Sequence, residues 1–311
     1  MDPVCHTLVG AALSVAGLKR LTRGATVTLV LAANIPDVDI VAAMMGRNLE
    51  WRRGITHGVP ALLLWPFVLT GLIWLWDRLR RTSPEAQVSP RGLLIISAIG
   101  VVSHPFLDYL NSYGMRWLMP IRDRWYYGDS LFIIDPWLYL LLGTGLWLAS
   151  RARRSGHPDP ARPARLAVSL AAVYVGVMMS ATLAARWLVA RELGPEGATF
   201  RFMATAVPVD PLAKHVVIDA GDHYRVGSVR FGRRPAVAIA EVVPKGERLE
   251  PARARLAATR EGRAFLHWAR FPAARDVGPG IVRVYDLRYT DGSAAGWAAY
   301  DVSLTGSPAD R

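Results

Sequence analysis

Long apolar segments occupy most of the first two thirds of the chain, and short polar segments separate them. Residues 62–76 and 166–185 contain no charged side chain. A helix needs about 20 apolar residues to cross the roughly 30 Å hydrocarbon core of a bilayer. The first segment reaches that length when it is extended back to about residue 59. A third apolar segment, 136–150, reaches it when it is extended back to about residue 130. These three segments predict transmembrane helices.

Three further apolar segments, 4–18, 25–45 and 93–110, are interrupted by polar side chains. The interrupting residues are His6, Asn34, Asp37, Asp39, His104 and Asp108. In a soluble protein such segments would be ordinary buried helices. Because they lie among the predicted spans, we expect an all-α polytopic membrane bundle of about six helices over residues 1–192.

The pattern changes after residue 190, where short stretches of β-forming residues alternate with turn residues. Strands are predicted over 199–209, 215–218, 224–231, 236–243, 281–289 and 296–304, and short helices over 250–260 and 262–269. Residues 193–311 are therefore expected to form a small antiparallel α+β domain outside the membrane.

Basic loops predict the orientation. Alternate loops at 19–23, 78–91 and 151–165 are rich in arginine and lysine, and such loops tend to stay in the cytoplasm. The bias is moderate because the intervening loops also contain arginines. We expect the N-terminus and the C-terminal domain to be extracytoplasmic, and no cleavable signal peptide is apparent.

Composition narrows the class of protein. The 311 residues carry a net charge of +12, 52% are apolar and Cys5 is the single cysteine, which excludes a disordered chain and a disulfide scaffold. Excess positive charge also suits nucleic acid. In this chain the positive charge is better explained by loops that stay in the cytoplasm and by contacts with lipid headgroups. No motif that reads nucleic-acid bases is present. The expected partner is the lipid bilayer, with no nucleic acid.

The polar residues of the predicted spans fall at one depth. Asp37 and His104 each lie 13 residues into their helices, counted from about residues 24 and 91, or roughly 20 Å at 1.5 Å per residue. His6 and His57 lie near outer helix ends. Because a charge at a helix centre costs roughly 2.5–3.5 kcal/mol in a bilayer, this convergence predicts one functional site.

The residue types favour a divalent metal. Histidines with carboxylates suit Zn²⁺, Mn²⁺ or Fe²⁺. His104 and Asp108 share a helix face, and Pro36 would kink or end its helix, allowing both Asp37 and Asp39 to turn inward. Taken singly, each residue also has a structural interpretation. His6 suits a core histidine, Asp37 a helix cap, His104 with Asp108 a hydrogen-bonded pair, and Asp135 an N-cap.

Five motifs carry a family resemblance: MDPVCHTLVG at the N-terminus, ANIPDVD at 33–39, RRGITHG at 52–58, SHPFLDYLNSYG at 103–114 and DSLFIIDPW at 129–137. In order and spacing they resemble the YdjM-like family of bacterial membrane-bound metal-dependent hydrolases, up to about residue 150. Gly58 departs from the serine that many members have. The resemblance implies a multi-pass inner-membrane hydrolase with metal ligands at His6, Asp37, Asp39, His57, His104 and Asp108.

The favoured function is hydrolysis at the outer membrane face with bound Zn or Mn. Asp37 or Asp39 would accept a proton from a metal-bound water, and Arg53 could bind a phosphate bidentately. These roles suggest a lipid or lipid-linked phosphoester as substrate. Two alternatives remain: a membrane transporter or ion-binding protein using the same His/Asp cluster, and a partner-binding protein. The inner halves of the helices offer almost no polar path, which favours the enzyme.

Overall fold

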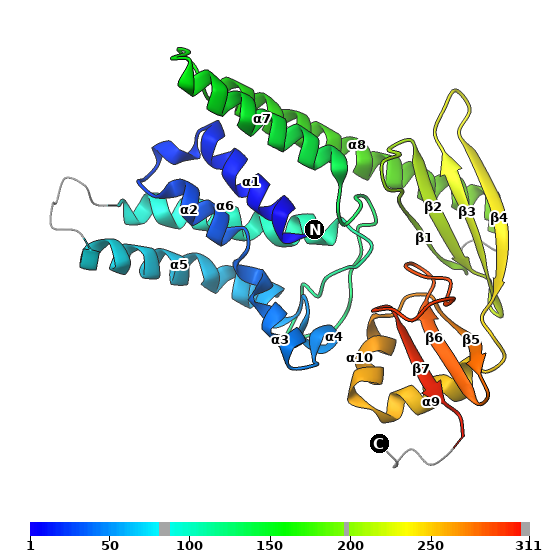
Figure 1. Cartoon of the computed structure of the whole chain (residues 1–311). Helices are drawn as coiled ribbons and strands as arrows, with labels where there is room; N and C mark the ends of the chain where they lie inside the picture. Colours follow the sequence, from blue (N-terminus) through cyan, green and yellow to red (C-terminus); the bar gives the residue numbers. More distant parts are fainter. Residues whose placement is uncertain (81–87, 196–198, 306–311) are drawn as a thin grey trace. The chain divides into compact units, whose positions relative to one another are not determined.

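The computed structural model describes residues 1–80, 88–195 and 199–305 (Figure 1). The chain divides into two compact units. The helical unit comprises Met1–Val41, Arg52–Leu183 and Thr205–Pro211. The sheet unit comprises Ala42–Trp51, Ala184–Ala204 and Leu212–Arg311.

Apolar helices make up the helical unit. They are α1 (Pro3–Ala16), α2 (Ala25–Ala32), α5 (Val59–Arg80), α6 (Pro90–Tyr109), α7 (Pro136–Arg154) and α8 (Arg162–Leu193), with short 3-10 helices η1 (Leu18–Arg20), η2 (Ile35–Ile40) and η3 (Ile55–His57). The last turns of α8 belong to the sheet unit. Figure 1 shows α1 between α6 and α7.

Three of the described helices, α5, α6 and α8, are long and apolar enough to cross a membrane. Together they indicate a membrane location. Helix α1 has 14 residues, which is short of a full span. Helix α7 has 19 residues, but Arg151, Arg153 and Arg154 occupy its last turn. The structure thus supports three of the six expected spans. Residues 81–87 of one predicted cytoplasmic loop lie outside the described residues.

The helix expected over 25–45 is wrong as a continuous span. Helix α2 ends at Ala32 after eight residues, or about 12 Å of rise. Pro36 lies at the start of η2, where its fixed φ and missing N–H suit the first turn. The chain therefore leaves the regular helix before the two aspartates, and η2 carries both Asp37 and Asp39.

Side-chain caps begin three helices of the helical unit. Asp2, Ser89 and Asp135 accept hydrogen bonds from backbone N–H groups in the first turns of α1, α6 and α7, respectively. Asp135 also accepts a hydrogen bond from the hydroxyl of Tyr174, at 3.0 Å. The structural interpretation of Asp135 as an N-cap is confirmed.

The sheet unit contains two sheets. One has the strand order β1 (Arg201–Ala206), β2 (Ala213–Asp219), β3 (His223–Arg230), β4 (Ala236–Pro244), and the other β5 (Pro272–Gly278), β6 (Ile281–Asp286), β7 (Ala299–Ser303). The pairs β2–β3, β3–β4, β5–β6 and β6–β7 are antiparallel. Strand β5 was not expected, because Arg275 and Asp276 interrupt its apolar pattern.

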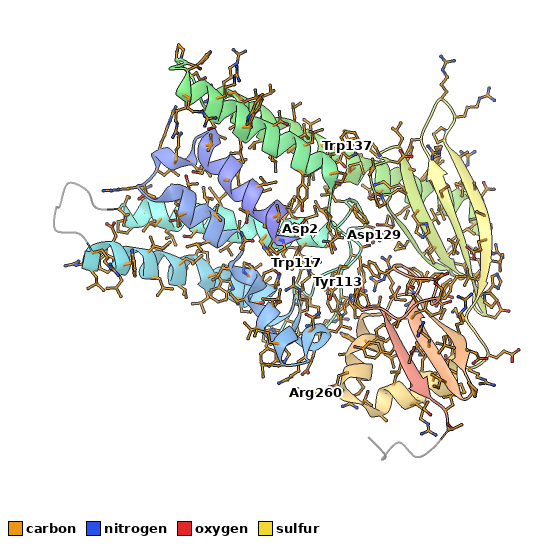
Figure 2. The ribbon with its side chains drawn as sticks, viewed as in Figure 1. Asp2, Tyr113, Trp117, Asp129, Trp137 and Arg260 are labelled. Carbon is orange, nitrogen blue, oxygen red and sulfur yellow. The ribbon has the colours of Figure 1, made fainter. Side chains whose placement is uncertain are left out.

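Short helices complete this unit: α3 (Val41–Met44), which begins at the boundary, α4 (Asn48–Trp51), α9 (Leu249–Ala258) and α10 (Arg260–Trp268). Helices α4 and α10 pack together, and Arg260 Nη2 lies 2.7 Å from Glu50 Oε1 (Figure 2). The fully buried Trp268 and Phe271 contribute to the apolar core. An α+β fold over the C-terminal third is therefore confirmed.

Candidate metal centre

Four buried side chains of the helical unit converge: Asp37, His57, His104 and Asp108. One ligand atom from each lies within 4.8 Å of the other three. Asp37 comes from η2, His57 ends η3, and His104 and Asp108 share one face of α6. Segments separated by up to 71 residues along the chain therefore supply one compact group of N and O atoms.

The spacing of these atoms fits a single metal ion. His57 Nε2 and His104 Nε2 lie 3.0 Å apart, and they lie 3.5 and 3.3 Å from Asp108 Oδ2. Their distances to Asp37 Oδ1 are 3.6 and 3.7 Å. Two ligands bound tetrahedrally at Zn²⁺ distances are about 3.4 Å apart. Five of the six separations among these atoms are therefore close to those that a Zn²⁺-sized cation requires, and the sixth is within 4.8 Å.

Unsatisfied carboxylate oxygens support the same interpretation. Both oxygens of Asp37 and Oδ2 of Asp108 are buried, and they make no hydrogen bond within the described part of the chain. Arg52 Nη2 does lie 3.2 Å from Asp37 Oδ1, within ion-pair distance. Buried polar atoms without partners are rare in proteins, and a bound cation would neutralise and ligate these oxygens.

Hydrogen bonds outside the group orient both imidazoles. His104 Nδ1 lies 2.7 Å from the carbonyl oxygen of Ala33. Because that oxygen only accepts, Nδ1 carries the proton and Nε2 keeps the lone pair that binds metal. His57 Nδ1 faces Asp39 Oδ2 at 3.3 Å and Thr56 Oγ1 at 3.0 Å, so its Nε2 is directed into the group.

Asp39 lies outside the group of four, although the sequence suggested it as a ligand. Its Oδ2 accepts the backbone N–H of Arg53 at 2.7 Å and the Thr56 hydroxyl at 3.3 Å. Its Oδ1 accepts from Arg52 Nη1 at 2.8 Å. The Asp39 carboxylate therefore positions His57 and the loop before it.

His6 also lies outside the group but contacts it. Its ring stacks on that of His104, with centroids 3.8 Å apart, and its Nε2 lies 3.3 Å from Asp108 Oδ1. The Met1 amino group contacts the same oxygen. His6 therefore packs against His104 and Asp108. It contacts Oδ1 of Asp108, so Oδ2 remains available to the group of four.

Arg53 faces the protein interior. Its guanidinium donates to Asp108 Oδ1 at 2.8 Å, to Asn111 Oδ1 at 3.1 Å and to the carbonyl of Gly114 at 3.0 Å. The guanidinium carbon also lies over the ring of Tyr113, 4.7 Å from the ring centroid. With 2% of its side chain exposed, Arg53 holds Asp108 and has little access to a substrate phosphate.

The neighbouring Arg52 is the more accessible arginine, with 15% of its side chain exposed. It pairs with both Asp37 and Asp39, at 3.2 and 2.8 Å. Burial opposes its charge, but the two carboxylates raise the pKa of Arg52 above its ordinary value. The RRGITHG motif contains both arginines, and nothing in its pattern distinguishes Arg52 from Arg53 as the more accessible one.

The candidate site lies within the part of the chain that matches a known protein family. Residues 1–188 match the family described as YdjM inner membrane protein. The uncharacterized protein YfhP of Bacillus subtilis (strain 168) is 24% identical over 161 residues, which cover 48% of this chain and 47% of YfhP. The chain thus spans about half the length of this curated relative. No solved structure matches it.

Proposed function

Because the chain belongs to the YdjM inner membrane protein family, we propose that it is a membrane-embedded, metal-dependent hydrolase. Asp37, His57, His104 and Asp108 would hold one divalent cation, with Zn or Mn as the metals that suit the donor set. The observation that carries the proposal is the buried group of two imidazole nitrogens and two carboxylate oxygens spaced for a single ion.

A divalent cation bound here would lower the pKa of a coordinated water to about 7 and polarise the bond to be hydrolysed. Asp37 is the residue best placed to accept the proton. Its Oδ1 belongs to the ligand group, and its Oδ2 makes no hydrogen bond to the described residues. Asp39, whose oxygens already accept several hydrogen bonds, supports His57 instead.

Arg52 would bind the anionic part of the substrate. It is the more exposed of the two site arginines, and its contacts with Asp37 and Asp39 keep it beside the metal ligands. A guanidinium matches the geometry of a phosphate or carboxylate. A phosphoester attached to a lipid fits this chemistry, because the site lies among helices apolar enough to enter a membrane. Such a substrate would enter from the bilayer.

The basic loops support an orientation with the site toward the outer face of a bacterial inner membrane and with residues 193–311 extracytoplasmic. Cysteine accessibility labelling tests this orientation. Cys5 is buried, so a cysteine introduced at exposed Ser293 would report on the sheet unit. Labelling of intact cells by a membrane-impermeant maleimide is expected at this position.

Elemental analysis of the purified protein tests the metal centre. Wild type is expected to carry about one Zn or Mn per chain, and His104→Ala to lose it. His267→Ala, in α10 of the sheet unit, is the matched control and should keep the metal. Hydrolysis of a lipid phosphomonoester by wild type but not by Asp37→Ala would support the activity. Retained metal with ion uptake by proteoliposomes and no hydrolysis would support the transport alternative.

A further inference from the structure

A second feature of the helical unit is an apolar groove of about 430 Å³ between α1, α6, α7 and α8. Helix α8 contributes the most residues, and they fall at helical spacing along one face: Val168, Ala171, Ala172, Val175, Gly176 and Met179. Small side chains at three of these positions leave space beside α8. A Cβ built at Gly176 would meet no atom within 4 Å.

The lining favours hydrocarbon over water. Ser103 is the one residue with a polar side chain among those lining the groove, and its hydroxyl donates to the carbonyl of Gly100 at 2.8 Å. A buried water needs two to four polar partners, and the groove offers fewer than that. Because α6 and α8 are apolar enough to cross a membrane, hydrocarbon chains are the solvent available to it.

Size limits what the groove accepts. An apolar cavity of about 150 Å³ is known to hold a benzene molecule. By simple proportion, 430 Å³ accommodates a hydrocarbon chain on the order of 15 carbon atoms. That is the length of one lipid chain, and too small for a transmembrane helix of a partner protein.

The groove shares α6 with two candidate metal ligands and α1 with His6. On α1, Val9 and Leu13 line the groove, and they follow His6 at i+3 and i+7, which places all three on one helix face. On α6, the lining residues Ser103 and Leu107 immediately precede His104 and Asp108. Adjacent helical residues point about 100° apart, so neighbouring faces of α6 serve the groove and the site.

We propose that the groove binds the hydrocarbon chain of a lipid phosphoester whose phosphate reaches the metal centre. The proposal rests on the proposed function and specifies its substrate class, a lipid with at least one long chain. Packing in the groove selects chain length and shape, because transfer from bilayer to groove removes no chain from water. A short-chain phosphoester would therefore be a poor substrate even when its phosphate is identical.

Photolabelling in lipid nanodiscs tests the groove. The probe is phosphatidic acid with a diazirine on one acyl chain, and labelled peptides are mapped by mass spectrometry. Wild type is expected to be labelled within 168–179 or 103–107. Gly176→Leu fills the groove and should reduce this labelling at least fivefold. Gly71→Leu, on α5 where a Cβ also meets no atom, is the matched control and should not. Equal labelling of wild type and Gly176→Leu would overturn the proposal.

A second probe separates a substrate chain from an ordinary bilayer lipid. The matching diacylglycerol carries the same diazirine chain but no phosphate. His104→Ala should reduce labelling by phosphatidic acid at least threefold and leave labelling by diacylglycerol unchanged. The same response to both probes would show a structural lipid and contradict the substrate assignment. The metal content of each sample distinguishes failure of the proposed function from failure of the groove proposal. A wild type without metal would refute the proposed function, whereas the comparison with Gly176→Leu would still test the groove.

Discussion

His104 donates its Nδ1–H to the carbonyl oxygen of Ala33, at 2.7 Å, where α6 meets the end of α2. Gly100 lies one turn earlier on α6, and a Cβ there would lie 2.5 Å from the Cβ of Ala32. The absence of a side chain at Gly100 therefore allows the approach that brings Ala33 to His104. This contact fixes the tautomer and direction of one candidate ligand.

Gly100→Ala is expected to weaken this contact. The added methyl group must push α2 away from α6, which typically costs about 1–3 kcal/mol in a packed interior. Displacing Ala33 also removes the hydrogen bond that orients His104, and loss of such a partner typically lowers metal affinity 10–100-fold. Thermal unfolding and competition with a chelator measure the two effects. Gly71→Ala should change neither, and unchanged metal affinity in Gly100→Ala would contradict the role of the Ala33 contact.

The two adjacent arginines should separate stability from activity. Arg53→Gln leaves Asp108 buried without its guanidinium partner, and breaking a buried pair in this way typically costs about 3–5 kcal/mol. Arg52→Gln alters a partly exposed side chain and should lower kcat/KM for a phosphoester at least tenfold while Tm changes little. Unfolding curves and steady-state kinetics on both variants are the measurements. The opposite assignment, with Arg52 structural and Arg53 kinetic, would refute this division.

Asp37 and Asp39 are expected to differ as well. Asp37→Asn removes a charged ligand and should abolish measurable metal binding, whereas Asp39→Asn removes only the support of His57 and should weaken binding 10–100-fold. Metal titrations monitored by competition with a chromophoric chelator compare the two. Equal losses would indicate that Asp39 ligates the metal directly, as the family resemblance implied.

Much of the fold follows from local pattern. The expected strands over 215–218, 224–231 and 236–243 match β2, β3 and β4, because these antiparallel strands carry their own β-forming residues and turns. Pro36 also indicated the end of a helix. The length of α2 did not follow, because apolar residues continue past Ala32 and resemble a membrane span. The helix ends at Ala32, four residues before Pro36, and the apolar pattern does not mark that position.

Part of the candidate site could also be predicted from local sequence pattern. Counting helical rise predicted that Asp37 and His104 lie at one depth, although the helix counted to Asp37 is not continuous, because α2 ends at Ala32 and η2 carries Asp37. The different roles of Arg52 and Arg53 could not be predicted from the sequence. Arg53 has a φ of 50°, in the left-handed region that residues other than glycine rarely adopt, so a regular helix or strand pattern does not predict where its side chain lies. The Ala33 carbonyl could not be identified either, because every residue carries the same backbone group.

The sheet unit should lose stability in mild acid through His215 on β2. Burial lowers the pKa of His215 below its ordinary value of 6.5. The unfolded chain therefore takes up a proton before the folded chain does, so this contribution is complete above pH 6.5 and is lost as the pH falls below it. His215→Gln should flatten the dependence of Tm on pH between about 6.5 and 5. An equally steep dependence in the variant would exclude His215 as its source.

Metal removal should destabilise the helical unit. Without a cation, Asp37 and Asp108 place two carboxylates in a buried group whose oxygens lack full hydrogen bonding. Binding to the folded state alone stabilises it by about 2.7 kcal/mol at a metal concentration 100 times Kd. A chelator should therefore lower the Tm of wild type, and added Zn²⁺ or Mn²⁺ should restore it. His104→Ala should begin at the lower Tm and respond to neither treatment. A chelator effect of the same size in that variant would place the responsible metal elsewhere in the protein.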